Sequence, residues 1–558
     1  MKKYNLFKIL AITIVVGFIL TLFIPSSYLD YTGKVVTNNV NSVGIVGVLS
    51  NLSISISYFN GIAIFLVAVA CLYGLMSKID LYNRFVSNTA TKFKGKERLL
   101  VILTIIVFGV LACLVNDPLI LIVFVPFIYQ VMKALDIDKK IILSSILVAG
   151  LIGAMCGIYN KTLFTLLKLE LNTLLLVKMI VLVLSLALLI FFTAPKKQSK
   201  EVAKKAAKKA KVKEEIKRVA TKVARRNKDV KVNKVVYAIL TLLFGTIGIN
   251  KFYARDIKAG ILRILFCWTL IPTILSLVEF VAVLTEKQDK NGQIPANSDR
   301  RSCVLFGACV VLFVLFTIGA IIPWEALINK FDAFSDFNTW LGKLAIGKYK
   351  VFNNIIGAPA AVDATTGSST GTIQVFGTWA LADVATYLFL LVGIIGLCSK
   401  VKFNEFIAAE TNAIKKILPV ALTAMFISIV LVLMVTSGVN ITICHAIIKL
   451  TKGFNLATLS LGTIVGSIIV GDFYYFTSTI VSVFSTVINN TDLNGVIGLV
   501  TQSLHYLTMM IAPTSVGLVI GLYYFNIPFG KWIKYIWKVL LGLFVISIVS
   551  AIIVFALV

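Results

Sequence analysis

Charged residues are scarce in this chain, and the motifs of the common soluble enzyme classes are missing. Asp, Glu, Lys and Arg make up 14% of the 558 residues, against 58% hydrophobic residues. The sequence has no phosphate-binding glycine loop with a lysine, no histidine and cysteine cluster at metal-ligand spacing, and no Gly-x-Ser-x-Gly elbow. Its eight cysteines all lie in or at the ends of apolar runs, where we expect structural packing. We therefore expect neither a soluble globule nor an enzyme.

Long apolar runs dominate what is present, and the mean hydropathy is +0.94. The first run, 9–24, follows three lysines and has no small-residue cleavage site, so it is interpreted as a transmembrane helix and not as a signal peptide. Residues 26–57 have the composition of an outer loop, whereas 78–98 form a basic loop of cytosolic character. We predict an all-α, polytopic transmembrane bundle of about 11–13 spans in the cytoplasmic membrane, with a cytosolic N-terminus.

A polar interruption, Asn116-Asp117-Pro118, separates the apolar arms 99–115 and 119–132. Arms of 14 to 17 residues reach roughly 21 to 26 Å as helices, which is less than the hydrocarbon thickness of about 30 Å. A carboxylate and a proline at this depth are tolerated mainly where the backbone lines a cavity or is buried in protein. The pattern predicts an interrupted or re-entrant hairpin, which is typical of transporter binding sites.

A second interruption, residues 436–440, follows the apolar run 418–435, and we predict that it pairs with the first. Both halves begin with a helix that ends in Ile-Pro, followed by an outer loop, a returning helix and a basic loop, so they look like two pseudo-repeats. Whether the repeats are parallel or inverted stays open. Four regions follow, namely 1–195, an N-terminal transporter half; 196–234, a basic helical linker; 235–300, an inserted two-helix module; and 301–558, a C-terminal half.

The linker 196–234 contains 17 Lys or Arg residues against four acidic residues. A basic run of this kind binds nucleic acid in many soluble proteins, but here it lies between membrane segments and lacks aromatic residues. Contact with anionic lipid is the functional interpretation, and a solvated cytosolic linker is the alternative. We expect no nucleic-acid partner.

The candidate substrate-binding or ion-binding residues are polar groups at the interruptions of the apolar runs. Broken helices offer dipole ends to an anion and free carbonyl groups to a coupling cation, with Na⁺ or H⁺ as the expected ion and no other metal or cofactor. Each position could instead be an ordinary cap, turn or proline kink. The candidates are Asn116, Asp117, Asn160, Thr436, Ser437, Asn440, Asp472, Pro513, Thr514 and Ser515.

Two stretches near the C-terminus carry a family resemblance. The segments 512–515 (Ala-Pro-Thr-Ser) and 527–532 (Ile-Pro-Phe-Gly-Lys-Trp), with the order of helices, resemble the C4-dicarboxylate anaerobic carrier-like (YfcC-type) transporters of the ion-transporter superfamily. The resemblance covers about residues 1–195 and 300–558. It implies a secondary carrier of organic anions or amino acids that is coupled to Na⁺ or H⁺. The chain departs from this family at both hairpin tips, so the substrate stays open.

The inserted segment 234–292 resembles a TM2 domain. Residues 245–253 match the motif Gly-x-x-Gly-x-His-x-Phe-Tyr, with Asn250 in place of the histidine, and Arg255 stands where a glycine is expected. Glu279 occupies an acidic position that is usually Asp, and we expect it to pack between helices. The motif residues are Gly245, Gly248, Phe252, Tyr253, Asp289 and Gly292.

Together these features predict an ion-coupled symporter or antiporter of small organic anions or amino acids that works by alternating access. The alternative is a membrane scaffold or sensor in which the TM2 module and the linker recruit partners or anionic lipid. Expected partners are the small-molecule substrate and the lipid bilayer, and the chain could form a homodimer.

Overall fold

The structure is a computed structural model of the whole chain. It describes residues 4–30, 34–37, 44–170, 174–193, 230–267, 271–296, 298–328, 330–350, 360–362, 369–371, 376–398, 401–451 and 454–557. Most of the linker predicted over 196–234 lies outside these residues, so its interpretation stays a prediction.

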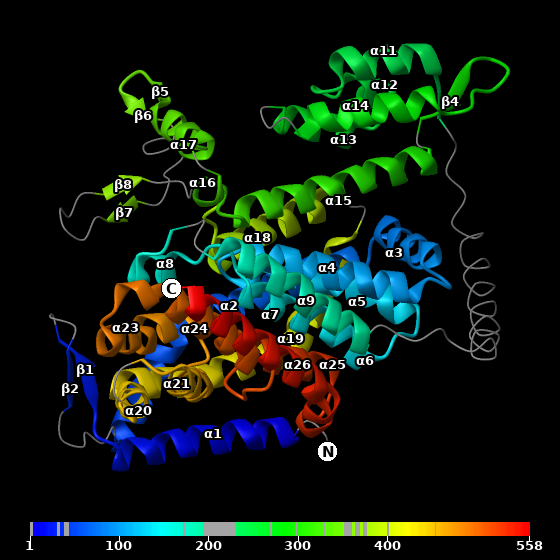
Figure 1. Cartoon of the computed structure of the whole chain (residues 1–558). Helices are drawn as coiled ribbons and strands as arrows, with labels where there is room; N and C mark the ends of the chain where they lie inside the picture. The colour runs from blue at the N-terminus through cyan, green and yellow to red at the C-terminus, as the bar shows by residue number, and fades with distance from the viewer. Residues whose placement is uncertain are drawn as a thin grey trace.

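The described residues form a bundle of helices that run along a common direction, and the predicted all-α membrane architecture is confirmed (Figure 1). Within the described part of the chain, five helices are long and apolar enough to cross a membrane, and the bent pair α2–α3 makes a sixth candidate. Large apolar side chains such as Ile12, Val183 and Ile552 are exposed on the outer helices, as expected where lipid covers them. The predicted 11–13 spans also counted segments that the structure shows as shorter, interrupted helices.

The N-terminal half contains two helices that are interrupted near the middle of the bundle. α2 begins at Gly44, so the outer loop predicted over residues 26–57 is wrong for its second part. The buried Ser55 hydroxyl of α2 donates to the Ser428 carbonyl of α19. The elements are α1 (Tyr4–Phe23), β1 (Ser27–Leu29), β2 (Val35–Thr37), α2 (Gly44–Met76), α3 (Asp80–Lys92), α4 (Glu97–Leu114), η1 (Pro118–Phe124), α5 (Val125–Ala134), α6 (Lys139–Leu143), η2 (Ser144–Val148), α7 (Ala149–Met155), α8 (Lys161–Leu167) and α9 (Leu175–Thr193).

The inserted module forms a small unit of its own beside α15 (Figure 1). Its two short strands pair antiparallel, with Val232 opposite Ile294, and tie the ends of the module together. Its core contains Tyr237 and Val283, both fully buried. The elements are β3 (Lys231–Asn233), α11 (Lys234–Phe244), α12 (Ile249–Tyr253), α13 (Ile257–Leu265), α14 (Ile271–Leu284) and β4 (Gln293–Pro295).

The C-terminal half repeats the pattern of interrupted helices. α19 is the longest helix, and its neighbours include α1, α2 and α25. The elements are α15 (Asp299–Ile321), α16 (Trp324–Leu327), α17 (Ala333–Lys343), β5 (Ala345–Ile346), β6 (Tyr349–Lys350), β7 (Ala360–Val362), β8 (Ser369–Gly371), α18 (Leu381–Cys398), α19 (Phe403–Ser437), α20 (Val439–Ile448), α21 (Leu456–Ile469), α22 (Phe473–Phe476), η4 (Thr477–Val481), α23 (Ser482–Ile488), η5 (Thr491–Leu493), α24 (Asn494–Met509), α25 (Val516–Phe525) and α26 (Phe529–Leu557).

The two sets of interrupted helices run in opposite directions, so the repeat is inverted. The side-chain amide of Gln502 in α24 donates to the Ala154 carbonyl of α7, whereas Asn494, eight residues earlier, donates to the Leu167 carbonyl of α8. At the other end, Gly521 of α25 lies against Leu143 of α6. The path α24–α25 therefore runs antiparallel to the path α6–α7–α8. This settles the orientation that the sequence left open.

Within each half, the breaks of two neighbouring segments lie together. In the first half, the Ile158 amide donates to the Cys113 carbonyl at 3.0 Å and joins the α7 break to the end of α4. In the second half, the Thr514 hydroxyl donates to the Ile468 carbonyl at 2.8 Å and joins the α24 break to the end of α21. The packing thus brings four separate interruptions to the centre of the bundle.

Candidate functional site

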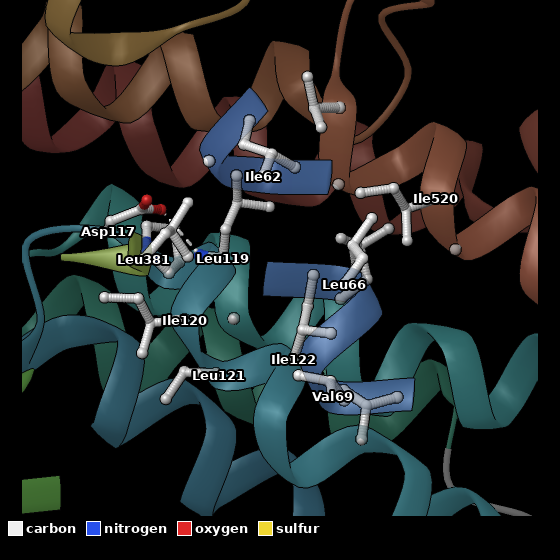
Figure 2. A pocket seen from close by; sticks show the side chains of 18 of the residues that line it. Ile62, Leu66, Val69, Asp117, Leu119, Ile120, Leu121, Ile122, Leu381 and Ile520 are labelled. Carbon is white, nitrogen blue, oxygen red and sulfur yellow. Dashed lines mark hydrogen bonds between the residues drawn. The ribbon is translucent and has the colours of Figure 1, made fainter. Parts of the chain in front are cut away.

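A cavity of about 1120 Å³ opens where the four interruptions meet. Its walls are largely aliphatic, and Figure 2 shows Ile62, Leu66 and Val69 of α2 along the segment that runs from Leu119 to Ile122. Polar groups enter it mainly at the breaks and from the ends of α2 and α19. The predicted site residues in its lining are Asn116, Asp117, Asn160, Asp472, Thr514 and Ser515.

Asp117 ends the first break. α4 stops at Leu114, and the backbone is extended at Val115 and again at Asp117. Pro118 accounts for the second of these, because it disfavours the helical conformation for the residue before it. The carboxylate accepts a hydrogen bond from the Leu119 amide at 2.9 Å and caps η1 (Figure 2). Asp117 is half-buried and retains exposed surface toward the cavity. Both readings of this residue, a helix cap and a group that faces a cavity, are therefore compatible with its geometry.

Asp472 holds the equivalent position in the second half. α21 stops at Ile469, and the Asp472 carboxylate accepts from the Tyr475 amide at 3.0 Å at the start of α22. Asp472 lines the same cavity as Asp117. The inverted repeat thus places one aspartate at each hairpin tip.

The other two breaks carry neutral caps. Asn160 accepts from the Leu163 amide at 3.1 Å at the start of α8, and Ser515 accepts from the Leu518 amide at 3.4 Å at the start of α25. Pro513 lies in the turn between α24 and α25, where its missing amide hydrogen leaves no helical bond to break. In chain order the four caps are therefore Asp, Asn, Asp and Ser, which repeats an acidic and a neutral group in each half.

The sequence predicted that residues 436–440 pair with Asn116-Asp117, and this prediction is wrong. The helix does break there, because Gly438 adopts a left-handed φ of 68°, but residues 436–440 do not line the cavity. Thr436 and Ser437 donate to their own helix, at the carbonyl groups of Val432 and Met434. The Asn440 amide donates to the Thr479 hydroxyl at 3.1 Å. The break turns the chain near β1, and Gly471-Asp472 takes the place that was predicted for it.

Sequence reasoning missed three buried residues at the breaks, namely Lys178, Gln502 and Trp532. The Lys178 ammonium donates to the Gly157 carbonyl and to the Gln502 side chain, and the Trp532 indole donates to the Met510 carbonyl. A lysine inside the apolar run of α9 was a detectable signal. His505 also lines the cavity, and its Nδ1 lies 3.1 Å from the Ser467 hydroxyl.

The TM2 motif residues build turns in the inserted module. Gly248 has a φ of 78°, and a Cβ there would lie 2.8 Å from the Gly260 carbonyl, so both its conformation and its surroundings favour glycine. Phe252 packs its ring on Gly260, whereas Tyr253 is exposed. Arg255, at the expected glycine, adopts a left-handed φ of 61° itself, so the turn is kept without glycine.

The remaining motif residues close the two ends of the module. Gly245 ends α11 close to Ser276 of α14. Asp289 accepts from the amides of Asn291 and Gln293 and pairs with Lys231 at 2.9 Å, while Gly292 has a φ of 69° in the same turn.

Glu279 is the centre of a buried ion cluster in this module. Its carboxylate lies 2.6 Å from both Lys251 and Arg263, and the Tyr237 hydroxyl donates to it at 2.7 Å. Asn250, in place of the family histidine, donates to it at 3.3 Å. Every partner belongs to the module, so the cluster holds α11, α12, α13 and α14 together, which agrees with the expected packing role. Among the described residues, no cluster of His, Cys, Asp and Glu has the geometry of a metal site.

Comparison with known proteins gives a match for the inserted module. The TM2 domain family matches residues 230–281. Over 59 residues the chain is 48% identical to a Bacillus subtilis (strain 168) protein that bears the name "Uncharacterized membrane protein YozV". That alignment covers 11% of this chain and 75% of the Bacillus protein. No solved structure matches the chain.

Proposed function

We propose that this chain, which belongs to the TM2-domain family of membrane proteins through residues 230–281, is an ion-coupled secondary transporter. Its solute would be a small organic anion of the dicarboxylate type or an amino acid, and it would cross the cytoplasmic membrane by alternating access. The proposal includes the C4-dicarboxylate carrier-like assignment of the two halves and a cytosolic N-terminus.

One observation carries this proposal. Two inverted sets of broken helices bring Asp117 and Asp472, one from each half, to a single cavity. Interrupted helices in corresponding positions of two inverted halves are typical of transporter binding sites, because the breaks offer backbone groups and dipole ends to a solute and an ion. A soluble role for such a chain is excluded by its hydrophobicity.

The charges of the cavity link ion binding to solute binding. Besides the two carboxylates, the lining holds Lys78, Lys161 and Lys416, whose ammonium groups attract an organic anion. An anionic group placed beside Asp117 or Asp472 is repelled until that carboxylate is protonated or paired with a cation. An amino acid could instead place its ammonium group beside one carboxylate. In both cases a cation or proton at Asp117 or Asp472 would favour loading of the anionic group, which is the physical basis of coupled transport.

The test is uptake into proteoliposomes that contain the full chain, with a panel of dicarboxylates and amino acids and with a Na⁺ or H⁺ gradient. We expect gradient-dependent uptake of at least one solute. Asp117→Asn and Asp472→Asn each remove a charge from the cavity. Each should reduce that uptake by roughly tenfold or more, because an interaction with a charged group contributes about 1.5–3 kcal/mol.

Ser437→Ala is the matched control, because Ser437 is buried at a helix break but lies outside the cavity. It should leave uptake within about twofold of the unmodified chain. Gradient-independent uptake, or no uptake of any solute by folded protein, would refute the transporter. In that case, binding of a partner or of anionic lipid by the full chain would favour a scaffold, provided that deletion of residues 196–301 abolishes this binding.

A further inference from the structure

Lys178 places a positive charge at the break between α7 and α8. It is the fourth residue of α9, and its side chain is only 4% exposed. The ammonium nitrogen lies 2.8 Å from the Gly157 carbonyl oxygen and 2.9 Å from Oε1 of Gln502. The ring of Phe164 lies 5.5 Å away, within the range of a cation–π contact. The side chain therefore joins the first-half break to α24 of the second half.

None of the described carboxylates pairs with this ammonium group. The ion pairs formed by the described residues do not include Lys178, and its two acceptors are neutral oxygens. Burial of an unpaired ammonium is costly, and the compensation here comes from carbonyl dipoles at the C-terminal end of α7. Carbonyl and amide oxygens that converge in this way are the ligands that small cations prefer.

The second half has a neutral group in the equivalent position. Trp532 is the fourth residue of α26, it is fully buried, and its indole nitrogen donates to the Met510 carbonyl at 2.9 Å, at the α24 break. A neutral donor is therefore sufficient to satisfy a carbonyl group that a break leaves free. The positive charge at Gly157 is a separate property of the first half, and it needs an explanation other than hydrogen bonding alone.

We infer that the oxygens of Gly157 and Gln502 form a monovalent cation site and that Lys178 occupies it as a tethered cation. The site accepts a free alkylammonium ion once the lysine side chain is shortened. The consequence for transport rests on the proposed function. Because Lys178 already fills the first-half site, the coupling ion would bind at the cavity carboxylates instead. The cation site itself does not depend on transport.

The test measures thermal unfolding of the full chain in detergent, with methylammonium chloride as the probe and choline chloride at equal ionic strength as the control. Lys178→Ala leaves space and removes the ammonium donor of both oxygens, although the Gly157 carbonyl keeps a 3.3 Å hydrogen bond from the Gln502 amide. Its Tm should therefore fall by several degrees and then rise with methylammonium toward the unmodified value. Lys178→Met fills the same space with an apolar chain, so its Tm should fall without any recovery. The unmodified chain should respond equally to the two salts.

Lys178→Ser provides the same space with a hydroxyl group that can satisfy a helix carbonyl, and it is used if the alanine variant does not fold. Variants that fold only when purified in methylammonium would also support the site. No specific recovery in either shortened variant, or equal recovery in Lys178→Met, would overturn it. Uptake assays of the unmodified chain report on the transporter separately, so the two proposals fail through different measurements.

Discussion

The contact between α4 and α7 gives the most specific stability prediction. Gly153 faces α4 so closely that a Cβ built on it would lie 2.1 Å from the Gly109 carbonyl oxygen and 2.9 Å from the Cys113 amide nitrogen. Both of these are backbone atoms, which cannot rotate away as the end of a side chain can. Gly153→Ala should therefore push the two helices apart by roughly 1.4 Å, since ordinary contacts of a carbon atom begin near about 3.5 Å.

The magnitude follows from a comparison with a second glycine of α7. A Cβ on Gly150 would meet nothing within 4 Å, so Gly150→Ala is the matched control. Both changes gain the same helix propensity, about 1 kcal/mol. Only Gly153→Ala adds the cost of overpacking, typically about 1–3 kcal/mol, and we expect the upper end because the clash is between backbones. The two variants should therefore differ by about 3 kcal/mol.

The measurement is thermal unfolding of the full chain in lipid nanodiscs, followed by tryptophan fluorescence. Gly153→Ala should have the lower Tm of the pair. It should also weaken the hydrogen bond from Ile158 to Cys113, which joins the first two breaks, and so reduce any uptake that the unmodified chain supports. If Gly153→Ala were as stable as Gly150→Ala, the close packing of α4 on α7 would be refuted.

Two further predictions concern the inserted module. Glu279→Gln leaves Lys251 and Arg263 buried without their anion and should cost about 3–5 kcal/mol, against about 1 kcal/mol for Tyr237→Phe. Hydrogen exchange of the α11–α14 amides measures the two losses of stability. Equal losses in Glu279→Gln and Tyr237→Phe would contradict the central role of Glu279 in the ion cluster. The Gln293 amide and Lys231 hold the pKa of Asp289 below its ordinary 3.8. The ionised carboxylate therefore stabilises the folded module above pH 3.8, and this stabilisation is lost as the pH falls through the lowered pKa. Because amide exchange itself slows in acid, the readout is the protection factor. The protection factors of the β3–β4 amides should fall in acid in the unmodified chain but not in Asp289→Asn, and the same fall in both would contradict this.

Much of the architecture could be predicted from local sequence. Apolar runs indicated the membrane helices, and Asn116-Asp117-Pro118 indicated a break, because a proline and a carboxylate end a helix wherever the helix lies. The glycine motif of 245–253 identified the TM2 domain for the same reason, since each glycine meets a local steric need. The extent of α2 was missed because its first half is rich in serine and asparagine, and burial against α19 is not visible in the sequence of α2 alone.

The pairing of the breaks depended on the fold. Residues 436–440 and Gly471-Asp472 both interrupt apolar runs, and composition alone does not distinguish a turn at the end of a bundle from one at its centre. The orientation of the repeat was equally open, because loop charges report only on the ends of helices. Lys178 was overlooked since its partners, Gly157 and Gln502, lie 21 and 324 residues away along the chain.

By itself, the sequence determined that this protein is a helical membrane protein, that it carries a TM2 domain, and where several of its helices break. These properties follow from the transfer free energy and the backbone preferences of neighbouring residues. Only the tertiary structure decided which breaks meet, that Asp117 faces the same cavity as Asp472, and that a lysine bridges the two halves. Those features come from antiparallel packing of segments that are hundreds of residues apart, and no local pattern encodes such a distance.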